Sequence, residues 1–259
     1  MKVAAVGDNC MDVYNTGEAY PGGNPVNVAV YYVRCGGEAS YTGVVGTDPY
    51  GSVMKESIAA KGVDVTTVTA KEGKTAITHV ELKNGERVFG EYEEGVMADF
   101  VLSEEQMEYL CKQDLVVTAL WGNVHEQLKE IHDHGVKIAY DAATAPESKA
   151  AQIAIPVTDY LFSSAEFDTE ELRTQMRELS AQGPELVVAT LGEEGSIAYD
   201  GTRFYTCGIV PCEVVDTLGA GDSFIAGFLK GMSDGKSIVE CMQEGAACSS
   251  VTLGYFGAW

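Results

Sequence analysis

The sequence contains no apolar run of the roughly 18 residues that a membrane-spanning helix needs. Residues 1–14 also show no long apolar stretch of the kind found in secretory signals, because Gly7 and Asp8 interrupt them. The seven cysteines are scattered and include no Cys-x-x-Cys pair, which favours reduced thiols. These absences predict a cytoplasmic protein without a membrane partner.

Signatures of several common enzyme classes are missing as well. No segment fits the Walker A pattern, so an ATP site in this chain would not be a P-loop. The first predicted strand lacks Gly-x-Gly-x-x-Gly, which argues against a nicotinamide-dependent dehydrogenase. His125-Glu126 begins like a zinc-protease motif, but Lys129 stands where the second histidine ligand belongs.

Basic residues are scarce: 17 Lys and Arg face 39 Asp and Glu, which gives a net charge of −22. Such a field repels phosphate backbones, so no nucleic-acid partner is expected, whereas a cationic substrate would be tolerated. The chain nevertheless has an ordinary globular composition, with 46% apolar residues in 259 positions. That length allows one large α/β domain, or two small ones, with a substantial core.

Short apolar runs alternate with longer helical patterns along the chain. This alternation predicts buried parallel strands joined by crossover helices. Ser103 and Gln106 have the spacing of a capping box at the start of one helix. The predicted strands are 3–6, 115–120, 136–140, 160–162 and 186–190, and the predicted helices are 24–35, 103–111, 166–181, 219–232 and 237–253.

A β-hairpin interrupts this α/β pattern. Residues 75–82 and 87–92 flank Asn84-Gly85, a strong signal for a tight hairpin turn. With these two as the central turn residues, Leu82 would face Arg87, Val80 would face Phe89 and Thr78 would face Glu91, all on one face. A hairpin does not easily join a parallel core, so we expect a small β lid built from about 12–20 and 75–95.

The most informative segment is Asp216-Thr217-Leu218-Gly219-Ala220-Gly221-Asp222, which precedes an apolar helix. The small residues let backbone N–H groups approach an anion, and the helix start directs its free N–H groups to the same place. Asp222 falls in the first turn, where the helix dipole should keep it ionised and able to accept a hydroxyl proton. A helix start with a capping Asp is the alternative for the Gly-Ala-Gly-Asp portion taken by itself.

The longer motif resembles the C-terminal signature of the ribokinase-like (PfkB) carbohydrate kinases, and other segments match in order along the whole chain. Gly22-Gly23-Asn24 resembles the family's N-terminal glycine pair, and Thr190–Gly195 its nucleotide-side turn. Within the family, the likeness is greatest to kinases that act on glycated amino acids. The segments that carry it are 7–14, 22–31, 87–100, 120–122, 216–228 and 257–259.

The resemblance implies a single domain over residues 1–259 with a three-layer α/β fold: a central, mostly parallel sheet, helices on both faces and a small β lid. It implies transfer of a phosphoryl group from ATP to a primary hydroxyl of a sugar or glycated amino acid. Asp222 would accept the hydroxyl proton, and the N–H groups of Gly219, Ala220 and Gly221 would stabilise the charge on the transferred group.

The resemblance also implies the sugar-binding residues. Asp12 would accept hydrogen bonds from sugar hydroxyls, and Gly22, Gly23 and Asn27 would lie beside the same ligand. The alternative for Asp12 is an exposed charge on a loop. For the other three it is ordinary turn and helix-cap chemistry.

Nucleotide and metal residues are implied in the same way. Thr190, Gly192 and Gly195 would lie against ATP, although the two glycines also suit a plain β-turn. In place of the family's Asn-x-x-Glu this sequence has Ser163-Ser164-Ala165-Glu166, so Glu166 is the candidate for Mg²⁺, through water. Its alternative is an acidic residue in the first turn of the helix 166–181. Dependence on a monovalent cation such as K⁺ stays open, as does the effect of Ser163.

Substrate choice within the family depends on the lid. A glycated amino acid carries an ammonium and a carboxylate, and we expect Arg87 or Glu91 to contact that charged tail. The alternative is a solvated run of charge. Another ketose or riboside kinase, or a non-catalytic sensor of a sugar or nucleotide, remains the competing function. Lids of this family often pair between subunits, so a homodimer is expected.

Overall fold

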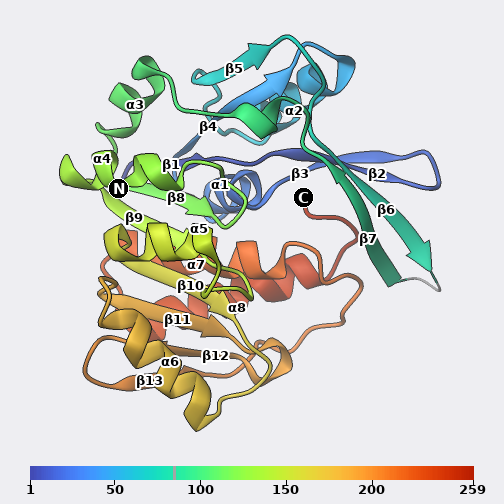
Figure 1. Cartoon of the computed structure of the whole chain (residues 1–259). Coiled ribbons are helices and arrows are strands. Elements are labelled where there is room, and N and C mark those ends of the chain that lie inside the picture. The colour runs from blue at the N-terminus through green and yellow to red at the C-terminus, as the bar shows by residue number, and fades with distance from the viewer. Residues whose placement is uncertain (84–85) are drawn as a thin grey trace.

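The computed structural model describes residues 1–83 and 86–259, and for residues 82, 83, 86, 87 and 89 it describes the backbone alone. In this part of the chain, a nine-stranded sheet with the order β13-β12-β11-β10-β9-β8-β1-β4-β5 forms the centre of the molecule (Figure 1). Its strands are β1 (Val3–Val6), β4 (Ala39–Gly46), β5 (Val68–Lys71), β8 (Leu115–Ala119), β9 (Lys137–Asp141), β10 (Tyr160–Ser164), β11 (Leu186–Thr190), β12 (Ser196–Tyr199) and β13 (Phe204–Cys207).

Neighbouring strands from β11 to β5 run parallel, and β12 and β13 extend the sheet as an antiparallel edge. The parallel strands inside the sheet are almost wholly buried because helices cover both of their faces, whereas the edge strand β5 is mostly exposed. Parallel strands place all their carboxyl ends at one edge of the sheet. In open α/β sheets that edge is where ligands bind.

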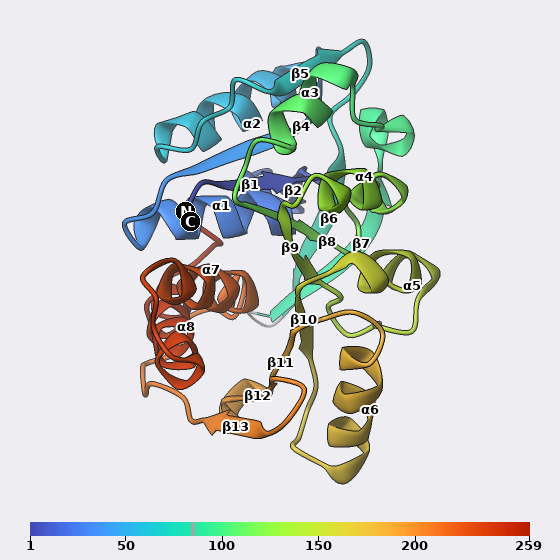
Figure 2. The same ribbon diagram turned by 90° about the vertical axis from the view of Figure 1, so that its left-hand side faces the viewer.

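The helices form two layers, one on each face of the sheet (Figure 2). One layer contains α1 (Asn24–Arg34), α2 (Pro49–Ala60), α7 (Ala220–Ser233) and α8 (Ile238–Leu253). The other contains α3 (Glu104–Leu110), α4 (Leu128–Asp133), α5 (Lys149–Ala154) and α6 (Glu170–Ser180). Short 3₁₀ turns lie at η1 (Gly95–Asp99), η2 (His125–Gln127), η3 (Ile155–Val157) and η4 (Gly192–Glu194). None of the described helices is long and apolar enough to cross a membrane.

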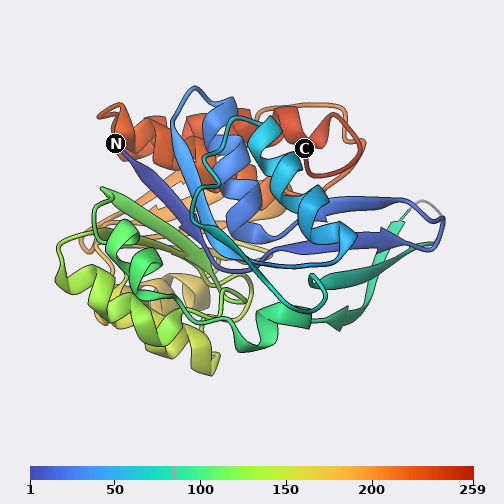
Figure 3. The ribbon, with the colours of Figure 1, turned by 90° about the horizontal axis from the view of Figure 1, so that it is seen from above.

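A second, four-stranded sheet extends beyond the main sheet, as Figures 1 and 3 show. We call it the β arm; it consists of β2 (Cys10–Tyr14), β3 (Ala19–Gly22), β6 (Ile77–Lys83) and β7 (Glu86–Glu93). Strand β2 pairs antiparallel with β3 and parallel with β6. The expected pairing between residues 12–20 and the hairpin strands is therefore confirmed.

The hairpin register is confirmed near its turn and wrong further away. Leu82 pairs with Arg87 and Val80 with Phe89, but Thr78 pairs with Tyr92 instead of Glu91. A β-bulge between Thr78 and Val80 adds one residue to β7, which shifts every later pair. The predicted turn residues 84 and 85 lie outside the described part of the chain.

Most predicted elements of the main domain are present, with two informative exceptions. The helix expected over 166–181 begins only at Glu170, because the Thr169 hydroxyl accepts a hydrogen bond from the Leu172 N–H (3.2 Å) and caps it there. Glu166 is therefore not in a first helical turn. Strand β4 was not predicted, although it lies beside β1 in the middle of the sheet.

Candidate active site

The start of α7 is shaped by a glycine that no other residue could replace easily. Gly219 is the N-cap and has φ 76°, a left-handed conformation that favours glycine. A Cβ on Gly219 would also collide with the hydroxyl of Tyr31 on α1. The α7 start can therefore pack closely against α1, which brings Asp222 in its first turn to the side chains of that helix.

Two amides of α1 hold the Asp222 carboxylate. The Asn24 Nδ2 donates to Oδ1 of Asp222 and the Asn27 Nδ2 donates to Oδ2, each at 2.7 Å. Burial raises the pKa of Asp222 to about 8; the bond from Asn27 lowers it, and the nearby Asp141 and Asp8 raise it. Burial thus opposes the expected effect of the helix dipole on Asp222. A pKa near the operating pH suits a general base.

Asn24 links Asp222 to two further carboxylates. Its Nδ2 also donates to Oδ2 of Asp141 (2.6 Å), and its backbone N–H donates to Oδ2 of Asp8 (3.3 Å). Asp141 ends β9 and Asp8 follows β1, so both lie at the carboxyl edge of the sheet. Burial raises the pKa of both groups, that of Asp8 to about 6. Sequence analysis did not identify Asn24, Asp141 or Asp8 as site residues.

The glycine pair of the N-terminal motif lies against this cluster. Gly23 has φ 111°, and a Cβ there would come within 2.7 Å of the Asn9 Cα and the Asp8 carbonyl oxygen. Asp12 lies in β2 with 7% exposure, so it is not on an exposed loop, and a Cβ on Gly22 would come within 3.0 Å of its Oδ2. The structure therefore brings Asp12, Gly22 and Gly23 close to one another beside Asp8.

The last described residues close the other side of the α1–α7 contact. The Trp259 indole N–H donates to Oδ1 of Asn27 (2.8 Å), which fixes the amide so that its Nδ2 points to Asp222. The Gly257 N–H donates to Oδ2 of Asp216 (2.7 Å), and the Tyr31 hydroxyl donates to the carbonyl of Ala258. Residues 257–259 thus help to hold the start of α7 and its carboxylate in place.

The residues expected on the nucleotide side lie farther along the same sheet edge. Thr190 ends β11, and its hydroxyl lies 2.9 Å from that of Ser164 on β10. Gly192 and Gly195, with φ 56° and 96°, bound the short turn that joins β11 to β12. No hydrogen bond among the described residues joins this group to Asp222.

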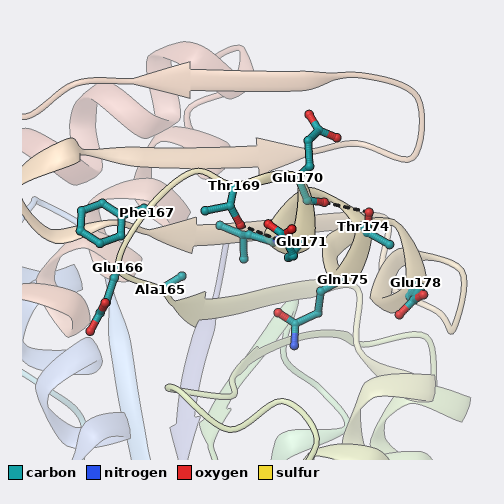
Figure 4. Close-up of a pocket in the computed structure, with 10 residues that line it drawn as sticks. Ala165, Glu166, Phe167, Thr169, Glu170, Glu171, Thr174, Gln175 and Glu178 are labelled. Carbon is teal, nitrogen blue, oxygen red and sulfur yellow. Dashed lines mark hydrogen bonds between the residues drawn. The ribbon is translucent and has the colours of Figure 1, made fainter.

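Glu166 lies in the loop between β10 and α6, where it lines an open depression of about 880 Å³. Figure 4 shows Glu166 and Phe167 at one end of this depression and Glu178 at the other. In the residues that the structure describes, no group of three or more His, Cys, Asp or Glu side chains could hold a metal ion. Ser163, which replaces the family's Asn, is buried in β10 with 8% exposure.

The two residues expected to contact a substrate tail lie on β7. Glu91 is exposed, and the bulge places Tyr92, not Glu91, beside Thr78. The Arg87 side chain lies outside the described part of the chain. Because the bulge breaks the alternation along β7, the expectation that Glu91 shares a face with Arg87 is not supported by the register.

The chain is similar to known kinases in sequence and in fold. The chain is 45% identical over 258 residues to fructoselysine 6-kinase of Escherichia coli (strain K12), covering 99% of both chains. It is 31% identical over 265 residues to the fructosamine kinase FrlD of Bacillus subtilis (strain 168), covering 100% of this chain and 93% of that one. Its fold matches that of Arabidopsis thaliana ribokinase, solved with ribose and ATP, with a TM-score of 0.87 at 22% identity over 99% of this chain and 93% of that one. The model of the pfkB family carbohydrate kinases matches residues 4–259, and the chain belongs to that family.

Proposed function

We propose that this protein is an ATP-dependent kinase that phosphorylates the 6-hydroxyl of fructoselysine. One observation carries the proposal: Asp222, held by Asn24 and Asn27 at the start of α7, lies in a chain 45% identical over its length to a fructoselysine 6-kinase. The sequence motif supplies the residues for phosphoryl transfer, and the hydrogen bonds give the carboxylate a fixed position. The product would be fructoselysine 6-phosphate together with ADP.

In the proposed reaction, Asp222 accepts the proton of the substrate hydroxyl while its oxygen attacks the γ-phosphorus of ATP. A new P–O bond forms to the sugar, the bond between the γ-phosphorus and the bridging oxygen breaks, and the electron pair leaves with ADP. A raised pKa makes the ionised Asp222 carboxylate a stronger base for the hydroxyl proton, and Asp222 releases that proton after product dissociation.

The N–H groups of Gly219, Ala220 and Gly221 would stabilise negative charge on the transferred group. Gly221 offers open space, since a Cβ built on it would meet no atom within 4 Å. The Ala220 N–H already donates to the Thr217 carbonyl, but over a long N···O distance of 3.3 Å. The Ala220 N–H can bind the transferred group once its hydrogen bond to the Thr217 carbonyl breaks.

Sugar hydroxyls would bind on the other side of Asp222. Asp12 supplies a buried carboxylate, and Gly22 and Gly23 let the backbone come close to the sugar ring. Asn27 would orient the general base and line the sugar site. These assignments follow from the family motif and are consistent with the short spacing between these residues.

ATP would lie along the carboxyl edge of the sheet, against Thr190, Gly192 and Gly195. Glu166 is exposed beside this edge, and its hard carboxylate oxygen suits Mg²⁺. A single carboxylate leaves most of the ion's coordination to phosphates and water, which fits the absence of a larger ligand cluster in the described residues. Mg²⁺, when bound, would neutralise charge on the phosphates.

The β arm would act as a lid over the sugar, and Arg87 or Glu91 would contact the amino-acid tail of the substrate. Glu91 lies in the bulged stretch of β7 between Phe89 and Tyr92, beside further acidic residues. If Arg87→Ala and Glu91→Ala both leave the preference for fructoselysine over fructose unchanged, this assignment is wrong. Steady-state kinetics with the two substrates measures that preference.

The β arm would also pair two subunits. Aromatic rings of Tyr14, Tyr20 and Phe256 cluster on it with centroid distances of 5.5–6.3 Å, and Tyr20 and Phe256 are 38% and 50% exposed. Exposed aromatic clusters are typical of protein interfaces. Light scattering on the purified protein should give twice the chain mass, and a monomer would contradict the pairing.

The activity itself is tested by ADP release in a coupled assay. We expect release with fructoselysine to exceed release with fructose, ribose or psicoselysine at equal concentrations. A preference for ribose or fructose would assign the chain to another kinase of the family. No ADP release with any of these sugars, despite a thermal shift on adding them, would favour a sensor.

A further inference from the structure

Asp8 and Asn24, which are hydrogen-bonded to each other near Asp222, each have one buried acceptor atom without a partner among the described residues. Asp8 is 7% exposed, and its Oδ2 accepts the Asn24 N–H, but its Oδ1 has no hydrogen-bond partner among the described residues. The side-chain Oδ1 of Asn24 is also buried and without a partner there. An unsatisfied buried acceptor is costly, so two of them at one place indicate a ligand that brings two donors.

The same place carries an excess of negative charge. Asn24 forms hydrogen bonds with Asp8, Asp141 and Asp222. The charge of Asp141 raises the pKa of Asp8, and the charges of Asp141 and Asp8 raise the pKa of Asp222. No lysine or arginine in the described part of the chain forms an ion pair with any of the three. A buried cluster of acids without a basic partner is stabilised by a cationic ligand.

These observations concern one side of the sugar site. Asp222 would meet the hydroxyl that is phosphorylated and accepts from the Asn24 side chain, whereas Asp8 accepts from the Asn24 backbone N–H. In fructoselysine, the 6-hydroxyl and the nitrogen on carbon 1 are at opposite ends of the sugar. That nitrogen is a secondary ammonium, which has one positive charge and two N–H donors.

We propose that Asp8 and Asn24 form a subsite for the secondary ammonium that joins the sugar to the amino-acid side chain. One N–H donates to Asp8 Oδ1 and the other to Asn24 Oδ1. The negative carboxylate of Asp8 balances the positive charge of the ammonium. The inference rests on the proposed function, because it adds a recognition element to the same sugar site. Plain fructose has a neutral hydroxyl at carbon 1, with a single donor, and it leaves one acceptor unsatisfied.

The β arm gives the rest of the substrate a direction. Strand β7 of this arm carries Tyr92, which is 40% exposed and pairs with Thr78. A chain attached to the ammonium would extend toward the β arm and solvent.

The experiment compares three substrates with wild type and Asp8→Asn. Fructoselysine and 1-butylamino-1-deoxyfructose both carry the secondary ammonium, but only the first has the amino-acid head group; fructose has neither. In Asp8→Asn we expect kcat/KM for both amine substrates to fall roughly 10- to 100-fold relative to kcat/KM for fructose. Asp99→Asn removes an acidic charge whose side chain is 86% exposed, and it should leave these ratios unchanged.

A fall confined to fructoselysine would overturn the inference, because it would place the recognition at the head group. An equal fall with all three substrates would overturn it too, because Asp8 would then act on the sugar or on the fold. Calorimetric binding to wild type without ATP gives a second measurement, in which the butylamino sugar should bind at least tenfold more tightly than fructose. Equal affinities would contradict the subsite while leaving the kinase proposal intact, whereas tight amine binding without any ADP release would support the subsite and contradict the kinase.

Discussion

The proposed sugar side and the proposed nucleotide side of the site are built differently. Around Asp222, side chains from α1, α7, β9 and the last three residues hold one another by direct hydrogen bonds. On the other side, Thr190 ends β11 and is half-buried, while Glu166 is exposed in a loop and lines an open depression. The first group is preorganised by the protein itself, and it concentrates buried charge at a cost in stability.

The difference indicates where a substitution will act. On the sugar side, a single change should alter both the chemistry and the free energy of unfolding, because each residue is part of the buried network. On the nucleotide side, a change should alter nucleotide affinity and leave stability nearly the same, since exposed loop residues contribute little to the core.

The largest expected effect is on turnover. Asp222→Ala should lower kcat by about 10²- to 10⁴-fold, the usual contribution of a general base, while the KM for the sugar changes much less. Stopped or coupled ADP assays measure both constants. Asp234→Asn, at the exposed opposite end of α7, is the matched control and should retain activity. A comparable loss in both variants would mean that helix α7, and not the carboxylate, is responsible.

The next effect is on stability and depends on pH. The pKa of Asp8 is about 6 in the folded protein and 3.8 in the unfolded chain, so the folded protein binds this proton more tightly. Below pH 4 ionisation of Asp8 costs the folded protein little stability. As the pH rises to 6, Asp8 lowers the free energy of unfolding by up to about 3 kcal/mol. Asp8→Asn should remove that penalty and raise the melting temperature at pH 8 by several degrees, with no gain at pH 4.

Asp200 provides a control of opposite sign. Burial alone would raise its pKa, but hydrogen bonds from Thr202, Tyr205 and the Arg203 backbone together lower it well below the usual range. Its stabilising contribution is present above the unfolded pKa and is lost as the pH falls. Asp200→Asn should therefore lower the melting temperature at pH 8, and a change of the same sign in both variants would contradict the assigned pKa shifts.

A smaller effect tests how Asp222, the proposed general base, is oriented. Trp259→Phe keeps a ring but removes the donor to Asn27 Oδ1, so the amide can rotate and its bond to Asp222 weakens. Loss of one such bond should lower kcat about five- to tenfold. It should also move the acidic limb of the kcat/KM profile to higher pH, because the Asn27 bond lowers the pKa of Asp222.

The control is the second tryptophan of the chain. Trp121 is 54% exposed in a turn after β8, and Trp121→Phe should leave the pH profile in place. A lower kcat in Trp259→Phe with an unshifted profile would mean that Trp259 merely packs against its neighbours.

The smallest effect belongs to the nucleotide side. Glu166→Gln should raise the KM for the magnesium–nucleotide complex about two- to fivefold, because a water-mediated contact to the ion contributes little binding energy. The melting temperature should not change. Glu178→Gln, at the far end of the same depression, should alter neither quantity (Figure 4). An effect of both variants would indicate that general surface charge is responsible.

Local sequence was sufficient to predict elements whose residue pattern fits a single type of secondary structure. The apolar runs predicted β1 and β11 at their observed bounds, and the capping box at Ser103 and Gln106 is present. The start of α6 was missed because the apolar spacing of Leu172, Met176 and Leu179 indicates a helix but not its first residue, which the Thr169 cap determines. Strand β4 was missed because its glycines and polar residues hide a run that is buried along its whole length.

The Asp-Thr-x-Gly-Ala-Gly-Asp motif determined that a carboxylate and glycine amides meet at a helix start, because both lie within one turn of chain and depend only on local geometry. Only the tertiary structure decided which residues hold that carboxylate and how acidic it is. Asn24 and Asp222 are 198 positions apart, and the Trp259 indole reaches across 232 positions to Asn27. The pKa of Asp222 depends on burial and on the neighbouring Asp141 and Asp8, and these follow from how β1, β9, α1 and α7 pack together.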